Sequence, residues 1–204
     1  MMIATVILAA GESRRMGSLK QMLAWGQDTV LGKTISTFQE AITGPVFVVV
    51  GYEGSRIKRQ LADRKVMWVD NPSYQKGMSS SIVAGIKALP AEVEGILLAL
   101  ADLPLLQSDT VKKVADTFLS SKHRLIVPVF QGRTGHPVLI AKEFFPELLK
   151  LQGDVGAKQI IRENEEQVFF LNVNDPGIYL DIDEPHTYAK LRATKGESAD
   201  AGFN

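Results

Sequence analysis

The sequence of 204 residues contains no cysteine and only three histidines. Without cysteine, a thiol nucleophile, an iron–sulfur cluster and a zinc site with thiolate ligands are all excluded. The absence also suits the reducing cytosol, and we expect a cytoplasmic protein. His123, His136 and His186 are too far apart in the sequence to predict a metal site made of histidines.

The chain also lacks net charge and long apolar runs. Lys+Arg and Asp+Glu number 23 each, so no overall field favours a nucleic acid or a membrane surface as a partner. No apolar run approaches the roughly 20 residues that a membrane-spanning helix needs. Residues 1–10 are apolar, have no basic segment and run into a glycine loop, which favours a strand over a signal peptide. An anionic substrate would therefore have to be bound by a local cluster of cations.

Short apolar runs alternate with amphipathic stretches. Runs that are rich in β-branched residues and apolar on both faces are typical of parallel strands covered by helices. They are Ile3–Leu8, Val46–Val50, Val66–Val69, Ile96–Leu100 and Leu125–Val129. Helical spacing appears at Val30, Ile35 and Phe38, at Ile82, Ile86 and Leu89, and at Val111, Val114 and Phe118. The alternation predicts a three-layer, Rossmann-like α/β fold with a mostly parallel sheet.

Towards the end of the chain the rhythm changes. Val138–Ile140 follows a Gly-His-Pro turn, and Val168–Leu171 precedes a turn rich in Asn, Asp, Pro and Gly. We expect this region to supply an antiparallel edge and a substrate lid. Ser108 is the predicted N-cap of the helix that follows it. We expect residues 1–192 to form a single domain, and the small, polar segment 193–204 to be a flexible tail.

The loop after the first predicted strand carries a local concentration of basic residues. Arg14, Arg15 and Lys20 all follow Gly11 within ten residues. Small residues let the backbone approach a ligand, and successive N–H groups around a glycine can bind an anion. Ligands of open parallel sheets bind at the carboxyl ends of strands, where this loop begins. The loop therefore predicts phosphate binding, with a solvated basic turn as the alternative.

Two common phosphate motifs do not explain the chain. The spacing G-x-G-x-x-G is absent, because Gly11 is followed by Glu12 and Ser13. The segment 26–34 ends in Gly-Lys-Thr like a Walker A loop, but it has five residues between its glycines where the motif has four. Asp28 or Thr29, as the cap of the next helix, explains this segment better.

An acidic residue leaves the fourth predicted strand. Ile96–Leu100 runs into Ala101-Asp102-Leu103-Pro104, and a carboxylate at the end of a buried strand is costly unless it is paired or bound to a metal. Hard cations prefer carboxylate oxygens and bridge the oxygens of a triphosphate. Asp102 is therefore a candidate magnesium ligand opposite the basic loop. Capping of the next helix is the alternative interpretation.

The pattern Leu8-Ala9-Ala10-Gly11-x-Ser13-x-Arg15-Met16-Gly17-x-x-Lys20 resembles the signature loop of the molybdenum-cofactor nucleotidyltransferases, the MobA-related family. Asp102 stands in a similar Ala-Asp-x-Pro setting, with Leu103 where methionine is frequent. Gly77-Met78-Ser79-Ser80-Ser81 resembles the family's stretch beside the nucleotide base. Later matches are the segments 135–139, 153–158 and 180–185, with Lys158 where arginine is more usual. The resemblance covers about residues 3–190 and implies the fold of nucleotide-diphospho-sugar transferases.

The resemblance implies a reaction in which the terminal phosphate of a molybdopterin cofactor attacks CTP and releases pyrophosphate. The product would serve an apo-enzyme of the xanthine dehydrogenase type. CTP is favoured over GTP because the first loop lacks the consecutive glycines of the guanylyl branch. The cofactor would be Mg²⁺, with Mn²⁺ as a substitute. The alternatives are a nucleotidyltransferase that uses GTP or a sugar phosphate, and a carrier of the finished molybdenum cofactor without catalysis.

The same resemblance assigns roles to residues. Arg15, Lys20 and Asp102 would be catalytic. The nucleotide would be bound by Leu8, Ala9, Ala10, Gly11, Ser13, Gly77, Met78, Ser79 and Ser81. The metal would be bound by Asp102 and by Asp183, with Asp181 as the competing candidate. The acceptor would be bound by His136, Asp154 and Lys158, although His136 could equally belong to a turn and Asp154 to a helix cap.

Overall fold

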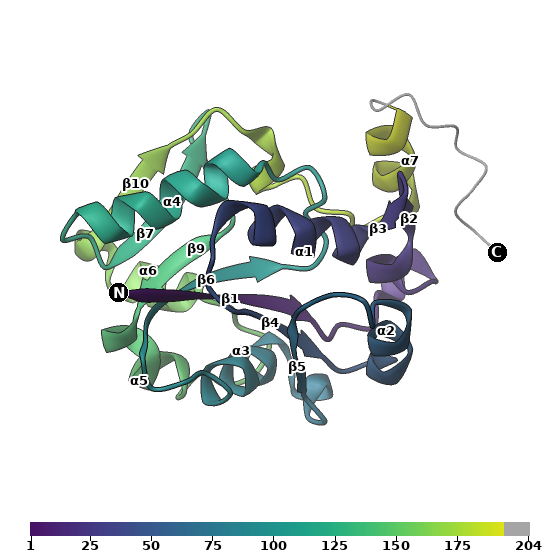
Figure 1. Cartoon of the computed structure of the whole chain (residues 1–204), viewed down its shortest axis with the longest axis horizontal. Helices are drawn as coiled ribbons and strands as arrows, with labels where there is room; N and C mark the ends of the chain where they lie inside the picture. The colour runs from purple at the N-terminus through teal and green to yellow at the C-terminus, as the bar shows by residue number, and fades with distance from the viewer. Residues whose placement is uncertain (194–204) are drawn as a thin grey trace.

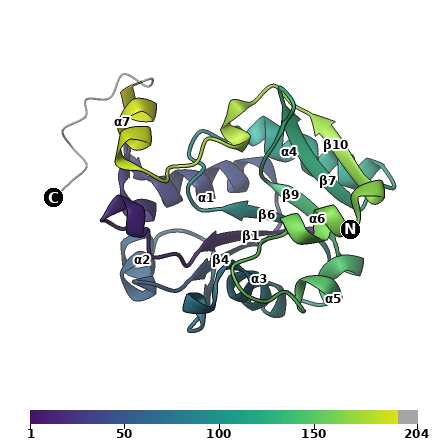
Figure 2. The ribbon, with the colours of Figure 1, turned by 180° about the vertical axis from the view of Figure 1, so that it is seen from behind.

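The computed structural model describes residues 1–193, and its centre is an eight-stranded sheet with helices on both faces (Figures 1 and 2). The sheet order is β10-β7-β9-β6-β1-β4-β5, with β8 paired to β7. The strands are β1 (Met2–Ala9), β4 (Val46–Val50), β5 (Met67–Asp70), β6 (Val93–Leu100), β7 (Leu125–Phe130), β8 (Arg133–Thr134), β9 (Val138–Ala141) and β10 (Val168–Asn172). The expected flexible tail, apart from Ala193, lies outside the described residues.

The helices form the two outer layers. They are α1 (Val30–Ala41), α2 (Gly54–Gln60), α3 (Met78–Lys87), α4 (Ser108–Ser120), α5 (Phe145–Leu148), α6 (Lys158–Glu163) and α7 (Pro185–Ala193). In both views α1 and α4 lie on one face of the sheet, and α3 and α5 lie on the other. Short 3₁₀ turns occur at Arg14–Met16, Lys20–Met22, Tyr74–Lys76, Lys142–Phe144, Glu165–Gln167 and Pro176–Ile178. Within the described chain, no helix has both the length and the hydrophobicity to cross a bilayer.

The mostly parallel sheet is confirmed. β1 pairs in parallel with β4 on one side and with β6 on the other, and its residues from Ile3 to Ile7 are buried. Burial of both faces explains why these strands are continuous apolar runs without polar alternation. The carboxyl ends of β1, β4 and β6 therefore meet at one edge, where the basic loop and Asp102 both emerge.

The position of the antiparallel strand differs from the prediction. β9 is antiparallel to both β6 and β7 and lies between them, inside the sheet and not at its edge. The edge strand β10 pairs in parallel with β7. The physical reason is in the sequence of β9, since Val-Leu-Ile-Ala is apolar on both faces and all four residues are buried. An edge strand of this composition would expose apolar surface and unpaired backbone groups.

A small hairpin and the last helix form a satellite cluster beside the sheet. β2 (Ala24–Trp25) pairs with β3 (Asp28–Thr29), and Tyr188 of α7 donates a hydrogen bond to the Ala24 carbonyl at 2.6 Å. The rings of Trp25 and Tyr188 lie 6.4 Å apart. Because α7 begins two residues after Asp183, this contact helps to fix the segment that carries that residue.

The two predicted helix caps have opposite outcomes. Thr29 caps α1 by accepting a hydrogen bond from the Gly32 N–H at 3.0 Å, so the Walker-like segment is a hairpin and a helix start. The prediction for Ser108 is wrong, because Ser108 is the first helical residue of α4 and follows the N-cap residue Gln107. The carboxylate of Asp175 accepts from the Gln107 N–H at 2.9 Å and from the Gly177 N–H at 2.8 Å. A partner 68 residues further along leaves no local signal in the sequence.

We predict that Asp175→Ala lowers the free energy of unfolding by about 2 kcal/mol, because two backbone N–H groups lose their acceptor. Ser108→Ala should lower it by less than about 0.5 kcal/mol, since its side chain caps nothing. Urea unfolding of both variants measures the difference. Equal effects of the two substitutions would contradict the role of Asp175 as the cap.

Candidate active site

The basic loop after β1 forms one wall of an open pocket of about 550 Å³. Gly11, Glu12, Ser13, Arg15 and Lys20 line it, as expected for a phosphate loop. The preceding residues are placed differently from the prediction. Leu8 and Ala9 belong to β1, Ala9 and Ala10 are buried, and none of the three residues lines this pocket.

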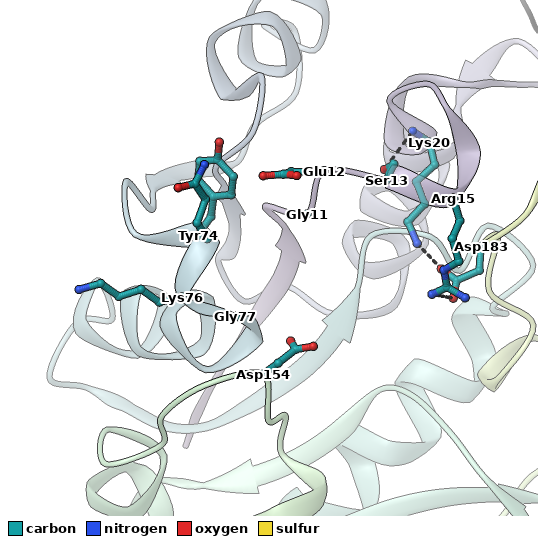
Figure 3. A pocket seen from close by; sticks show the side chains of 11 residues that line it. Gly11, Glu12, Ser13, Arg15, Lys20, Tyr74, Lys76, Gly77, Asp154 and Asp183 are labelled. Carbon is teal, nitrogen blue, oxygen red and sulfur yellow. Dashed lines mark hydrogen bonds and ion pairs between the residues drawn. The ribbon is translucent and has the colours of Figure 1, made fainter.

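Lys20 joins two carboxylates that are far apart in the sequence. Its ammonium donates to Asp102 Oδ2 at 2.5 Å and to Asp183 Oδ1 at 2.6 Å. Arg15 donates to the other oxygen of Asp183 at 2.9 Å (Figure 3). The exit of β6, the loop after β1 and the turn before α7 therefore converge on one group of charges. The structure brings together all the residues predicted to be catalytic or metal-binding.

The electrostatics of this group follow from its burial. Burial alone would lower the pKa of Lys20, but the two carboxylates outweigh it and raise that pKa, so the ammonium stays charged. Burial would raise the pKa of Asp183, yet Lys20 and Arg15 together lower it. The pKa of Asp181 is raised, first by burial and then by the negative charges of Asp102 and Asp183.

The residues present suit a divalent cation. Asp102, Asp181 and Asp183 each place one carboxylate oxygen so that all three lie within 4.8 Å of one another. Asp102 is 4% exposed, and its Oδ1 is buried without a hydrogen-bond partner in the structure. An unpaired buried carboxylate oxygen is costly, and a hard cation would satisfy it. Asp181 joins the set beside Asp183, so both candidates for the second ligand are within reach.

The opposite wall of the pocket is built from the turn before α3. Tyr74, Gln75, Lys76 and Gly77 line it, with Asp154 below them (Figure 3). Gly77 has φ 99° and ψ 177°, and a Cβ there would lie 2.5 Å from the Gly153 carbonyl oxygen. Only glycine suits such a position, because the backbone conformation and the close approach both exclude a side chain.

The serines of this stretch do not point into the pocket. Ser79 Oγ donates to the Gly153 carbonyl at 2.7 Å, and Ser81 Oγ accepts from Asn71 Nδ2 at 3.0 Å. Both side chains are buried and hold the first turn of α3 to neighbouring segments. Asp154 likewise accepts a hydrogen bond from the Met78 N–H at 3.2 Å. The hydroxyls of Ser79 and Ser81 were expected to contact a base, but in the structure they bind neighbouring protein groups and have a structural role.

A second pocket, of about 400 Å³, adjoins the first. Met78, His136, Lys158 and Asp181 are among its lining residues, so two of the three predicted acceptor residues lie here while Asp154 lines the first pocket. Its lining is more apolar. Near its rim the Arg133 guanidinium stacks 3.9 Å from the centre of the Tyr179 ring. The carboxylate group stands between the two pockets, with Asp183 lining one and Asp181 the other.

Comparison with known proteins places this geometry in a family. The model of the MobA-like NTP transferase domain matches residues 5–168. The chain belongs to this family. Molybdenum cofactor cytidylyltransferase of Escherichia coli K12 is 28% identical over 93% of this chain and 96% of its own length. Purine catabolism protein PucB of Bacillus subtilis 168 is 26% identical over 92% of this chain and 94% of its own length. A probable molybdenum cofactor guanylyltransferase of Bacillus cytotoxicus is 26% identical over 88% of this chain and 96% of its own length.

Solved structures agree. Rv0371c of Mycobacterium tuberculosis H37Rv has a TM-score of 0.83 at 27% identity, covering 93% of this chain and 97% of that one. A manganese complex of Rv0371c has a TM-score of 0.81 at 26% identity, covering 94% and 98%. The protein is thus a nucleotidyltransferase of the MobA-like family, and its acidic trio is consistent with a divalent metal.

Sequence reasoning missed several residues of this MobA-like site. Arg133 and Tyr179 come from separate segments, and only the tertiary structure stacks them. Tyr74 and Lys76 could have been noticed, because they precede the Gly-Met-Ser stretch directly. Gln21 follows Lys20 within a segment that otherwise reads as apolar, and no local pattern marks it.

His136 offers a test of the second pocket. Burial lowers its pKa below the ordinary value of 6.5, an effect that Lys158 reinforces and that the Leu98 carbonyl and Asp181 oppose. The unfolded chain then binds a proton more readily than the folded one, so His136 makes stability fall as pH drops below about 6.5. We expect His136→Gln to reduce the loss of the urea midpoint between pH 7.5 and 5.5. His186→Gln, at an exposed position, should leave that loss unchanged. An equal effect of the two substitutions would show that His136 is not the source of the pH dependence.

Proposed function

We propose that the protein transfers CMP from CTP to the terminal phosphate of molybdopterin or of the molybdenum cofactor. The observation that supports it is the meeting of two different pockets at one carboxylate group. The first pocket is polar and contains Arg15, Lys20 and Lys76, cations that a triphosphate could use, and the second combines apolar walls with cationic groups. The relatives named for molybdenum-cofactor cytidylyl and guanylyl transfer favour this acceptor class over a sugar phosphate.

The reaction needs little covalent help from the protein. An oxygen of the acceptor phosphate attacks the α-phosphorus of CTP, the bond to the bridging oxygen of the β-phosphate breaks, and pyrophosphate leaves. The acceptor phosphate is ionised at neutral pH, so no general base is required. Catalysis then consists of aligning two polyanions and stabilising negative charge on the phosphoryl oxygens.

The residues of the first pocket suit these tasks. The backbone from Gly11 to Ser13 offers N–H donors, and Arg15 can hold the departing phosphates with its planar guanidinium. Lys20 supplies a point charge beside the α-phosphate. Asp102 and Asp183 would hold Mg²⁺ or Mn²⁺, with Asp181 in reach, and the ion would neutralise charge on the phosphates.

The base assignment is supported by the Leu-Ala-Ala-Gly start of the loop together with Gly77. The cytidylyltransferase of E. coli and the guanylyltransferase of B. cytotoxicus are similarly distant from this chain, so overall identity does not choose the base. The loop favours CTP, since the family resemblance associates consecutive glycines with the guanylyl branch, and this chain has Ala9-Ala10-Gly11 at that place. An accessory carrier without catalysis would need neither Arg15 nor the buried Lys20–Asp102 pair.

We predict that kcat/KM for CTP exceeds that for GTP by at least about a hundredfold, roughly 2.7 kcal/mol of transition-state free energy. A pocket shaped for cytosine leaves polar groups unmatched by guanine and excludes its larger ring. Pyrophosphate release with purified molybdopterin measures both rates, and reactions without acceptor correct for hydrolysis. A preference for GTP would overturn the cytidylyl assignment and leave nucleotidyl transfer standing. Release of no pyrophosphate from either nucleotide would favour the carrier alternative.

A further inference from the structure

Gln21 is a buried polar residue directly beneath the phosphate loop. The residue is 2% exposed, and it lies in the 3₁₀ turn Lys20–Met22. The amide Nε2 donates to the Ala9 carbonyl at 3.2 Å and to the Gly11 carbonyl at 3.1 Å. Its Oε1 accepts from Ser13 Oγ at 3.1 Å. Both donor hydrogens and the carbonyl of the side chain are thus committed to the loop.

These bonds determine which way the loop backbone faces. In a planar trans peptide the C=O and N–H groups point in opposite directions. Because the Gly11 carbonyl points down to Gln21, the N–H of the same peptide unit, which belongs to Glu12, points to the other side. Gly11, Glu12 and Ser13 line the pocket, whereas Gln21 does not. The buried amide therefore turns the donor side of this peptide towards the space proposed for the triphosphate.

The same amide supports an unfavourable backbone conformation. Ser13 has φ 55°, in the left-handed region that residues other than glycine seldom adopt. Its hydroxyl donates to Gln21 and accepts from the Lys20 N–H at 3.3 Å. One chain of hydrogen bonds therefore runs from the loop through Ser13 to Lys20, whose ammonium binds Asp102. The shape of the loop and the position of the catalytic lysine are coupled.

We propose that Gln21 is a positioning residue that holds the nucleotide loop in its binding conformation before the nucleotide arrives. The inference rests on the proposed nucleotide site in the first pocket. Gln21 contacts no substrate and acts through Gly11 and Ser13. Ordering a loop only when a ligand binds weakens affinity, because the lost conformational entropy opposes binding. Removing the amide should therefore weaken nucleotide binding more than it weakens the fold, since its side-chain partners lie between Ala9 and Ser13.

The test compares Gln21→Met, which keeps length and burial but loses the hydrogen bonds, with Gln39→Met as the matched control. Gln39 also donates its amide to a backbone carbonyl, that of Lys65, but on an exposed surface. Calorimetric titration with CTP and Mg²⁺ should show at least tenfold weaker binding for Gln21→Met and unchanged binding for Gln39→Met. In steady-state kinetics KM for CTP should rise, while KM for the acceptor stays the same.

Amide hydrogen exchange without nucleotide separates this inference from the proposed function. Gln21→Met should speed exchange of the amides of residues 11–13 at least tenfold and leave those of β1 and β6 unchanged. If that occurs but wild-type protein binds no CTP, the loop role stands and the proposed donor fails. CTP affinity within threefold of wild type, with unchanged loop exchange, would overturn the role of Gln21. Should Gln21→Met fail to fold, Ser13→Ala removes one bond of the same set, and unaltered loop exchange in that variant would also overturn it.

Discussion

The ion pairs between Lys20 and the carboxylates of Asp102 and Asp183 organise the whole site. They tie the loop after β1 to the exit of β6 and to the turn before α7. A buried carboxylate is stable only with a counter-charge, and Lys20 provides it at Asp102. A divalent cation at the acidic trio competes with Lys20 for the same oxygens. The Lys20 ammonium supplies the positive charge that the carboxylates need, and a metal bound by Asp102, Asp181 and Asp183 would supply charge of the same sign.

The topology explains why these groups meet. β1 and β6 are adjacent and parallel, so their carboxyl ends deliver the basic loop and Asp102 to one edge of the sheet. The antiparallel strand β9 begins two residues after His136. The turn that contains His136 lines the second pocket. The carboxylates stand between this pocket and the first. The proposed transfer between two polyanions would use this arrangement, with one polyanion in each pocket and the reacting phosphates at the carboxylates.

The parallel centre of the sheet and the place of Asp102 were predictable from the sequence. The strands β1, β4 and β6 are apolar on both faces, and Asp102 follows such a strand. Asp183 came only from family resemblance, since nothing local distinguishes it from a helix cap. The interior place of β9 was missed, although its four apolar residues indicate burial on both faces. Ser79 and Ser81 were expected at the pocket, but their hydroxyls satisfy backbone and amide groups around α3. Such partners, like those of Gln21 and Asp175, exist only in the folded chain.

The most direct test of this account is Mn²⁺ binding in the presence of CTP, followed by electron paramagnetic resonance of the free ion. We predict that CTP promotes Mn²⁺ binding to the wild-type protein and that Asp102→Asn weakens this binding at least tenfold, about 1.4 kcal/mol. Asp109→Asn, at an exposed position in the first turn of α4, should have no effect. Equal Mn²⁺ affinity of the Asp102→Asn variant and the wild type would contradict the assignment of Asp102 as a metal ligand.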